Sequence, residues 1–145
     1  MIPPLDPVTG RLPPGEHEGS WEEVVERFGW NEHRRRLLDG LADGMGALAR
    51  AGCERAWLNG SFVTSKDEPA DFDVCWDPTA VDLDRLDPVF LDVSSGRAAQ
   101  KRRFGGEFLP NVIEAESGLA FADFFQNDRE TGKKGIVVLW IKEQP

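Results

Sequence analysis

The chain has 145 residues, a formal net charge of −9 and a hydrophobic fraction of 40%. This length fits one domain, and folding of such a chain buries roughly 70% of the surface of the unfolded chain. The acidic charge disfavours broad binding to DNA or to an anionic membrane, so small molecules and proteins are the expected partners. Cys53 and Cys75 lack metal or redox spacing, and no apolar run approaches membrane-spanning length, which predicts buried thiols in a cytoplasmic protein.

The N-terminal segment 1–16 carries five of the ten prolines and shows no periodic apolar face. Such a composition is typical of an extended arm on the surface or of a disordered segment. We therefore expect a proline-rich arm over residues 1–16 and a single domain over residues 17–145.

Two helices are predicted after this arm. Ser20 and Glu23 form a capping box, in which each side chain accepts a hydrogen bond from the backbone of the other, so a helix should begin at Trp21. Asn31 can cap a second, longer helix that ends at Gly52. Three small residues inside this second helix lower its intrinsic stability but permit close approach of another element: Gly40, Gly44 and Gly46.

Beyond residue 52 the apolar pattern becomes that of strands. Strands are predicted at 56–58, 72–76, 89–93 and 136–141. Helical segments are predicted at 82–86, 96–103 and 119–127, with a turn at 128–132. The last strand is apolar on both faces, which favours a position inside the sheet. The sum is an α/β or α+β domain in which a sheet flanked by helices follows two N-terminal helices.

The segment 58–77 contains the residues with the clearest chemical meaning. Gly60 and Ser61 form a turn after one apolar run, and Asp71 and Asp73 alternate with apolar residues in the next. Side chains two apart on a strand share a face, so the two carboxylates should be aligned. Mg²⁺ prefers a few carboxylates together with phosphate oxygens, and a glycine turn lets the backbone approach a phosphate closely. The pattern therefore predicts a metal and phosphate site.

This arrangement resembles the signature of the DNA polymerase beta-like nucleotidyltransferase superfamily, especially its minimal bacterial members. The shared pattern is hydrophobic-Gly-Ser, nine intervening residues, then Asp-hydrophobic-Asp-hydrophobic, within residues 55–95. The resemblance implies a nucleotidyltransferase-like mixed sheet, with Gly60 and Ser61 on the phosphates of a nucleoside triphosphate. It also implies two Mg²⁺ ions, or Mn²⁺ in their place, on Asp71 and Asp73. A third carboxylate on a later strand is expected from the family, and Asp92 is the candidate for this catalytic and metal-binding role.

The resemblance implies transfer of a nucleoside monophosphate to a hydroxyl group of a protein, an RNA or a small molecule, in a toxin-antitoxin or phage-defence system. The alternative is a catalytically inactive module that binds a nucleotide or a partner protein, as an antitoxin would. The whole chain also resembles short bacterial proteins of unassigned function that share its proline-rich start and the segment Gly-Arg-Ala-Ala-Gln-Lys at 96–101. That second resemblance implies no activity.

Simpler interpretations of the same residues remain open. Asp71 and Asp73 could form the solvated face of an edge strand, and Asp92 could cap the turn that Ser94 begins.

The cations nearby also have two interpretations each. Arg97 and Lys101 are candidates to hold triphosphate oxygens, whereas Arg102 and Arg103 are expected on a solvated helical face. Lys66 could reach a phosphate or lie free on the surface. The run 34–36, three consecutive arginines, is expected on a solvated face of the second helix.

Overall fold

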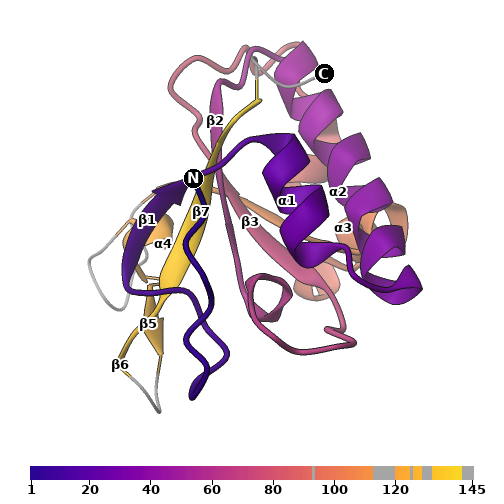
Figure 1. The fold of residues 1–145 in the computed structure, drawn as a ribbon. Coiled ribbons are helices and arrows are strands. Elements are labelled where there is room, and N and C mark those ends of the chain that lie inside the picture. The colour runs from indigo at the N-terminus through magenta and orange to yellow at the C-terminus, as the bar shows by residue number, and fades with distance from the viewer. Residues whose placement is uncertain (93, 113–119, 125, 129–131, 142–145) are drawn as a thin grey trace.

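The computed structural model describes residues 1–92, 94–112, 120–124, 126–128 and 132–141. A five-stranded sheet with the order β1-β7-β2-β3-β4 forms its centre (Figure 1). The strands are β1 (Gly15–Glu18), β2 (Arg55–Asn59), β3 (Phe72–Trp76), β4 (Gly106–Pro110) and β7 (Gly135–Trp140). β1 pairs with β7, and β3 with β4, in parallel, whereas β2 is antiparallel to both of its neighbours. The expected mixed α/β class is therefore confirmed.

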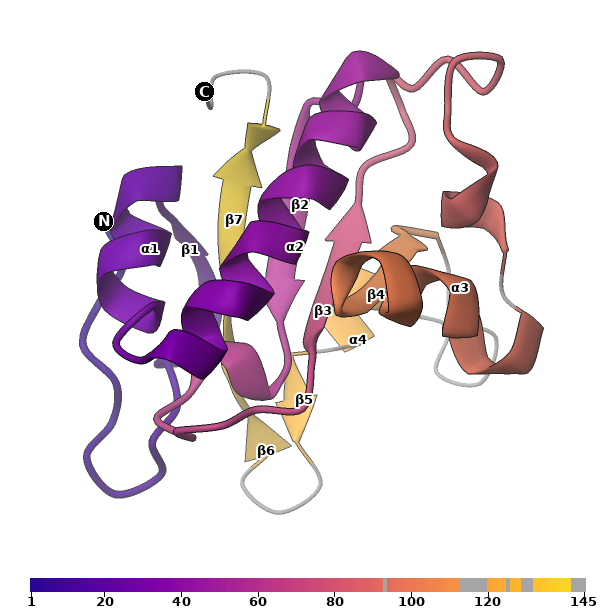
Figure 2. The same cartoon turned by 90° about the vertical axis from the view of Figure 1, so that its right-hand side faces the viewer.

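The helices α1 (Trp21–Phe28), α2 (Glu32–Arg50) and α3 (Ser94–Phe104) lie on one face of this sheet (Figure 2). The short helix α4 (Phe121–Phe124) contributes to a smaller core cluster on the other face, formed by Trp57, Cys75, Ala122, Ile136 and Val138. The hairpin of β5 (Asn127–Asp128) and β6 (Gly132–Lys133) leads into β7. Both cysteines are buried, as expected. No helix in the described part of the chain is long and apolar enough to cross a bilayer.

The N-terminal helices begin where the capping residues predict. The hydroxyl of Ser20 accepts from the backbone N–H of Glu23 at 3.1 Å, and the Glu23 carboxylate accepts from the backbone N–H of Ser20 at 3.3 Å. Asn31 caps α2 by accepting from the backbone N–H of Arg34 at 2.8 Å. Gly52 follows α2 with a φ of +97°, a conformation that glycine adopts without strain. Local hydrogen bonding therefore places this helical pair.

The predicted strand at 89–93 is wrong. Residues Pro88–Leu91 form a 3₁₀-helix, η2, because Asp87 accepts from the backbone N–H of Val89 and the proline favours a first helical turn. The expected helix at 82–86 is a turn. The fourth strand in chain order, β4, lies instead directly after Gly105, where the sequence had indicated only a break.

The remaining elements agree better with expectation. The helical segment expected at 96–103 corresponds to α3, and the predicted terminal strand corresponds to β7, which lies between β1 and β2. The helix expected at 119–127 and the turn at 128–132 lie partly outside the described residues; within them, α4 covers 121–124.

The N-terminal arm is an ordered part of the fold. Ile2 and Leu12 are 2% and 3% exposed, so the arm buries apolar side chains in the core. Arg27 donates to the carbonyl oxygens of Ile2 and Pro3 at 2.6 and 2.8 Å. The arm then runs into β1, a strand that the sequence did not predict, beside β7. The buried side chains of Ile2 and Leu12 and the hydrogen bonds from Arg27 therefore join this segment to the rest of the domain.

The expectation of a solvated face for all three arginines at 34–36 is wrong for the first of them. Arg34 is fully buried, although Arg35 and Arg36 are exposed. Its guanidinium lies between the start of α2 and the 3₁₀-helix η1 (Ser61–Val63), where it donates to backbone carbonyl oxygens. This side chain therefore ties α2 to the segment that follows the Gly60–Ser61 turn.

Two glycines of α2 permit the close packing that their small size suggests. A Cβ atom on Gly40 would lie 1.7 Å from the carbonyl oxygen of Phe104, and one on Gly44 would lie 2.2 Å from the ring of Phe108. Gly46 differs, because the nearest atom to its Cβ would be a side-chain nitrogen of Arg50 at 3.5 Å.

We therefore expect opposite effects from two alanine substitutions in one helix. Gly40→Ala should lower the free energy of unfolding by about 1–3 kcal/mol, because the backbone of Phe104 must move. Gly46→Ala should raise it by up to about 1 kcal/mol through helix propensity. Urea unfolding followed by circular dichroism measures both, and equal stability of the two variants would contradict the close approach at Gly40.

Candidate functional site

The Gly60–Ser61 turn lies against the carboxylate of Asp73. Antiparallel pairing of β2 and β3 places Asn59 opposite Asp73, so Gly60 follows directly at the end of β2. Gly60 has a φ of +83°, and a Cβ atom at this position would lie 2.3 Å from Oδ2 of Asp73. Only glycine fits both this conformation and this contact. The turn and the carboxylate, which are separated along the chain, therefore form one site.

Asp73 lies on β3 and Asp71 immediately precedes that strand; both are half-buried. Burial is the largest cause of the raised pKa of Asp73, which reaches about 7, and the charges of Asp71 and Glu107 add to it. Burial and the charge of Glu107 also raise the pKa of Asp71, although Lys101 partly offsets them. These carboxylates repel one another, so the site favours a proton or another positive group.

The third acid of this cluster is Glu107, which the sequence analysis missed. Parallel pairing of β3 with β4 places Glu107 opposite Asp73, so the charge of one carboxylate acts on the other. Arg97 contacts one carboxylate oxygen of Glu107 at 3.2 Å and Lys101 contacts the other at 3.0 Å. Burial alone would raise the pKa of Glu107, but the hydrogen bond from Lys101 and the charge of Arg97 hold it below its usual value.

A signal for Glu107 is present in the sequence. Residues 106–110 read Gly-Glu-Phe-Leu-Pro, in which the acid precedes a buried Phe108 as Asp71 precedes Phe72. The preceding glycines interrupt the helical pattern and mark the start of a new element. An acid next to an aromatic residue, directly after such a break, is the pattern that could have identified Glu107.

Asp92 lies outside this cluster. It follows η2 rather than lying on a strand, and its carboxylate accepts from the backbone N–H and the hydroxyl of Ser94 at 3.1 and 2.6 Å. These hydrogen bonds, that of the hydroxyl first, lower the pKa of Asp92. Asp92 therefore makes the contacts of a cap, which was the simpler of its two interpretations. The strand that was expected to carry Asp92 to the other acids is replaced by η2.

The predicted phosphate-binding cations divide into two groups. Arg97 and Lys101 lie beside the acids, where they bind Glu107. Arg97 is held there by a left-handed backbone, with a φ of +62°. Lys66 lines a cavity of about 410 Å³ together with Gly60 and Ser61. Arg97 and Lys101 thus lie beside Glu107, whereas Lys66 lies beside the glycine turn.

Asp71 and Asp73 are the two side chains of the site that would ligate a metal ion. No three His, Cys, Asp or Glu side chains within the described ranges are arranged to hold a metal ion. Glu107 is directed to its two cations, which explains why it does not join the aspartates as a third ligand. Burial first and neighbouring carboxylates second raise the pKa values of both aspartates, and a bound divalent cation would offset both effects.

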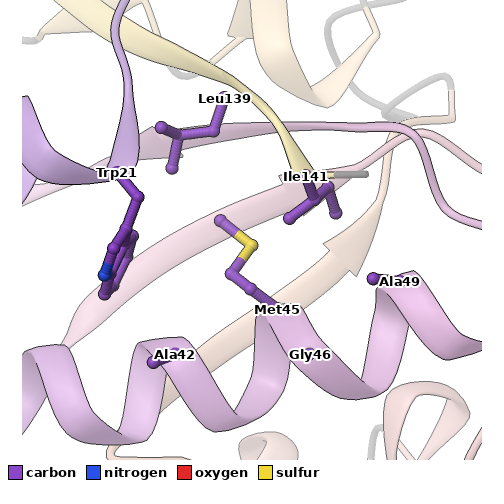
Figure 3. Close-up of a pocket in the computed structure, with 7 residues that line it drawn as sticks. All are labelled: Trp21, Ala42, Met45, Gly46, Ala49, Leu139 and Ile141. Carbon is purple, nitrogen blue, oxygen red and sulfur yellow. The ribbon is translucent and has the colours of Figure 1, made fainter. Parts of the chain in front are cut away.

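A second cavity, of about 170 Å³, lies between α2 and the end of β7 and has no such chemistry. Its walls are apolar (Figure 3), formed by Trp21, Ala42, Met45, Gly46, Ala49, Leu139 and Ile141. None of these side chains can act as an acid or a base at neutral pH, and the thioether of Met45 is the one group among them that can bind a metal, a soft one. The polar site at the Gly60–Ser61 turn is therefore the better candidate for chemistry.

Fold and site together define a mixed α/β protein with a carboxylate cluster beside a glycine turn. The chain belongs to the DUF6932 family, a family of unknown function, whose model matches residues 3–139. Neither the curated proteins nor the solved structures contain a match to the chain.

Proposed function

We propose that the protein is a Mg²⁺-dependent nucleotidyltransferase. The observation that carries this proposal is the contact between Gly60 and the carboxylate of Asp73. Because of this contact, a phosphate group bound by the backbone of the turn would also lie next to the acidic side chains. A nucleotidyltransferase-like arrangement is supported by the Gly-Ser turn after β2, by Asp73 on the antiparallel strand β3 with Asp71 just before it, and by a further acid on the neighbouring β4. This part of the proposal rests on the resemblance of residues 55–95.

Each residue of the cluster has a role in the proposed reaction. Gly60 and Ser61 hold the phosphates through backbone N–H groups and the hydroxyl. Asp71 and Asp73 would hold Mg²⁺, which supplies charge neutralisation at the phosphates when bound. Glu107 lies opposite Asp73 and would accept the proton of the attacking hydroxyl once it is released from Arg97 and Lys101.

The proposed step is an in-line displacement. The acceptor oxygen forms a bond to the α-phosphorus, and the bond from that phosphorus to the bridging oxygen of pyrophosphate breaks. Pyrophosphate leaves with the electron pair, and its charge is offset by the cations beside the site, Arg97 and Lys101 among them. Catalysis would come mainly from positioning and electrostatic stabilisation.

Label transfer tests this proposal. The protein is incubated with each of the four α-labelled nucleoside triphosphates, Mg²⁺ and cell lysate. We expect a labelled protein, RNA or small-molecule product with the wild type, and a loss of at least about 100-fold in the Asp71→Asn/Asp73→Asn variant. Asp92→Asn is the matched control, because it removes a carboxylate outside the cluster and should leave labelling unchanged. Equal labelling by the wild type and the double variant would contradict the proposal.

The ion pairs of Glu107 favour one alternative, an inactive nucleotide-binding module. Arg97 and Lys101 both engage this carboxylate, so it would have to exchange them for the acceptor hydroxyl during a reaction. Such a module would show a rise in melting temperature with a nucleoside triphosphate but no labelled product.

A further inference from the structure

The cavity beside the Gly60–Ser61 turn carries positive charge in an acidic protein. Three cations from separate parts of the chain line it: Arg11, Lys66 and Lys134. No carboxylate is among the lining residues that the structure describes. The charge of Lys134 also acts on Asp73, so the cavity borders the carboxylate cluster. A ligand here would place one end at the aspartates and an anionic remainder among the cations.

The cavity also offers hydroxyl groups as hydrogen-bond donors. Ser61 supplies one of them from the segment after β2, and Thr9 and Ser65 lie at the same walls, whereas the hydroxyl of Thr64 donates to the carbonyl oxygen of Ser61 at 2.6 Å. Hydroxyl and ammonium groups together are typical donors to phosphate oxygens. The walls therefore favour a ligand that carries several linked phosphate groups.

The N-terminal arm is built into this cavity. The backbone N–H of Ser65 donates to the carbonyl oxygen of Gly10 at 2.8 Å, and Arg11 forms a β-bridge with Thr64. Gly10 has a φ of +71°, and a Cβ atom there would lie 2.1 Å from the hydroxyl oxygen of Ser65. Asp6 closes the turn by accepting from the backbone N–H of Gly10 at 2.8 Å through its carbonyl oxygen. Backbone contacts thus fix the arm against the loop.

We propose that the N-terminal arm completes a binding site for a polyphosphate chain, in which Arg11 and Lys134 join Lys66 around the Gly60–Ser61 turn. That the polyphosphate is the triphosphate of a nucleotide rests on the proposed function. That the site binds a polyphosphate does not rest on it. The arm is thereby a part of the ligand site.

Isothermal titration calorimetry of the full chain with sodium tripolyphosphate, without divalent metal, tests this proposal. We expect one saturable site, about tenfold weaker in Arg11→Gln and in Lys134→Gln, which is the loss expected for one charge-assisted contact. Arg11→Lys should retain most of the affinity, and melting curves should show that each variant is folded. Arg36→Gln is the matched control, because Arg36 is exposed on α2 and pairs only locally with Glu32.

The outcomes separate this inference from the proposed function. Absence of saturable binding, or equal weakening by Arg36→Gln, overturns the site. The Asp71→Asn/Asp73→Asn variant should bind tripolyphosphate at least as well as the wild type, because it loses two negative charges.

Binding that depends on Arg11 but gives no label transfer supports the arm site and contradicts the enzyme. Label transfer with an unchanged KM for the nucleotide in Arg11→Gln supports the enzyme and overturns the arm site. Parallel titrations with ATP and with inorganic phosphate distinguish a nucleotide from a free phosphate as the ligand.

Discussion

Arg34→Met is expected to lower the free energy of unfolding by about 3 kcal/mol or more, one of the two largest effects in this protein. The guanidinium donates to the carbonyl oxygens of Phe28, Phe62 and Thr64 at 3.0, 2.7 and 2.8 Å, and twice to that of Lys66. Each buried acceptor that loses its donor costs about 1–3 kcal/mol. Burial lowers the pKa of Arg34 to about 10, so the side chain keeps all its donors at neutral pH.

The packing of this side chain adds to its hydrogen bonds. Its central carbon lies 3.7 Å from the centre of the Trp30 ring and 5.0 Å from that of Phe62. Methionine keeps part of the volume but provides no donor. Arg34→Lys should restore little, because an ammonium group cannot reach four carbonyl oxygens in the planar geometry of a guanidinium.

Urea unfolding measures the effect, with Arg36→Met as the control. Arg36 is exposed and pairs only with Glu32 in its own helix, so its replacement should change stability by less than about 0.5 kcal/mol. Similar losses in the two variants would contradict the role of Arg34. Because three of the four carbonyl groups that it binds, those of Phe62, Thr64 and Lys66, belong to the segment beside the cavity, Arg34→Met should also weaken tripolyphosphate binding.

Arg34 shows where prediction from the sequence reaches its limit. The capping residues Ser20 and Asn31 identify their helices because their hydrogen bonds connect residues three apart. The burial of Arg34 depends instead on carbonyl groups about 30 residues further along the chain. A run of three arginines at the start of a helix carries no local sign of such acceptors.

The residues of the candidate site likewise divide into those that local sequence patterns identify and one, Glu107, that such patterns do not. The Gly60–Ser61 turn and the alternation of Asp71 and Asp73 are local patterns, and antiparallel pairing of adjacent strands brings them together. Glu107 enters through parallel pairing of β4, whose register is set by the packing of α3 and a group of phenylalanines rather than by a turn. The hydrophobic-acid-hydrophobic pattern of residues 90–93 favours Asp92 as the third acid, whereas Glu107 lies beyond the segment that carries the resemblance.

Asp73→Asn is expected to stabilise the metal-free protein at neutral pH while it removes the proposed activity. Burial, together with Asp71 and Glu107, raises the pKa of Asp73 to about 7 in the folded protein. The unfolded chain releases the same proton near pH 4, so the folded state binds one more proton between these values. The stability that Asp73 contributes is therefore present below about pH 4 and is lost as the pH rises towards 7, at up to about 1.4 kcal/mol per unit.

Asparagine has nearly the shape of aspartic acid but no charge to lose. The difference in free energy of unfolding between Asp73→Asn and the wild type should therefore grow from pH 4 to pH 7 and then level off. Urea unfolding in the presence of EDTA measures it. Asp87→Asn is a control of opposite sign, because hydrogen bonds from Val89 and Arg103 lower the pKa of Asp87 and its ionised form stabilises the fold. Parallel pH profiles of the wild type and Asp73→Asn would contradict the prediction.

The same electrostatic cost connects stability with the proposed chemistry. A protein that holds Asp71 and Asp73 together at neutral pH without a cation is less stable than its neutral variant, so a bound cation would remove the penalty. At pH 8, MgCl₂ should raise the melting temperature of the wild type and leave that of Asp73→Asn nearly unchanged. An equal rise in both would assign the effect to general screening of the acidic surface. No rise in either would remove the metal from the proposed function, and the pH profile of Asp73 would still stand because it requires only the carboxylates.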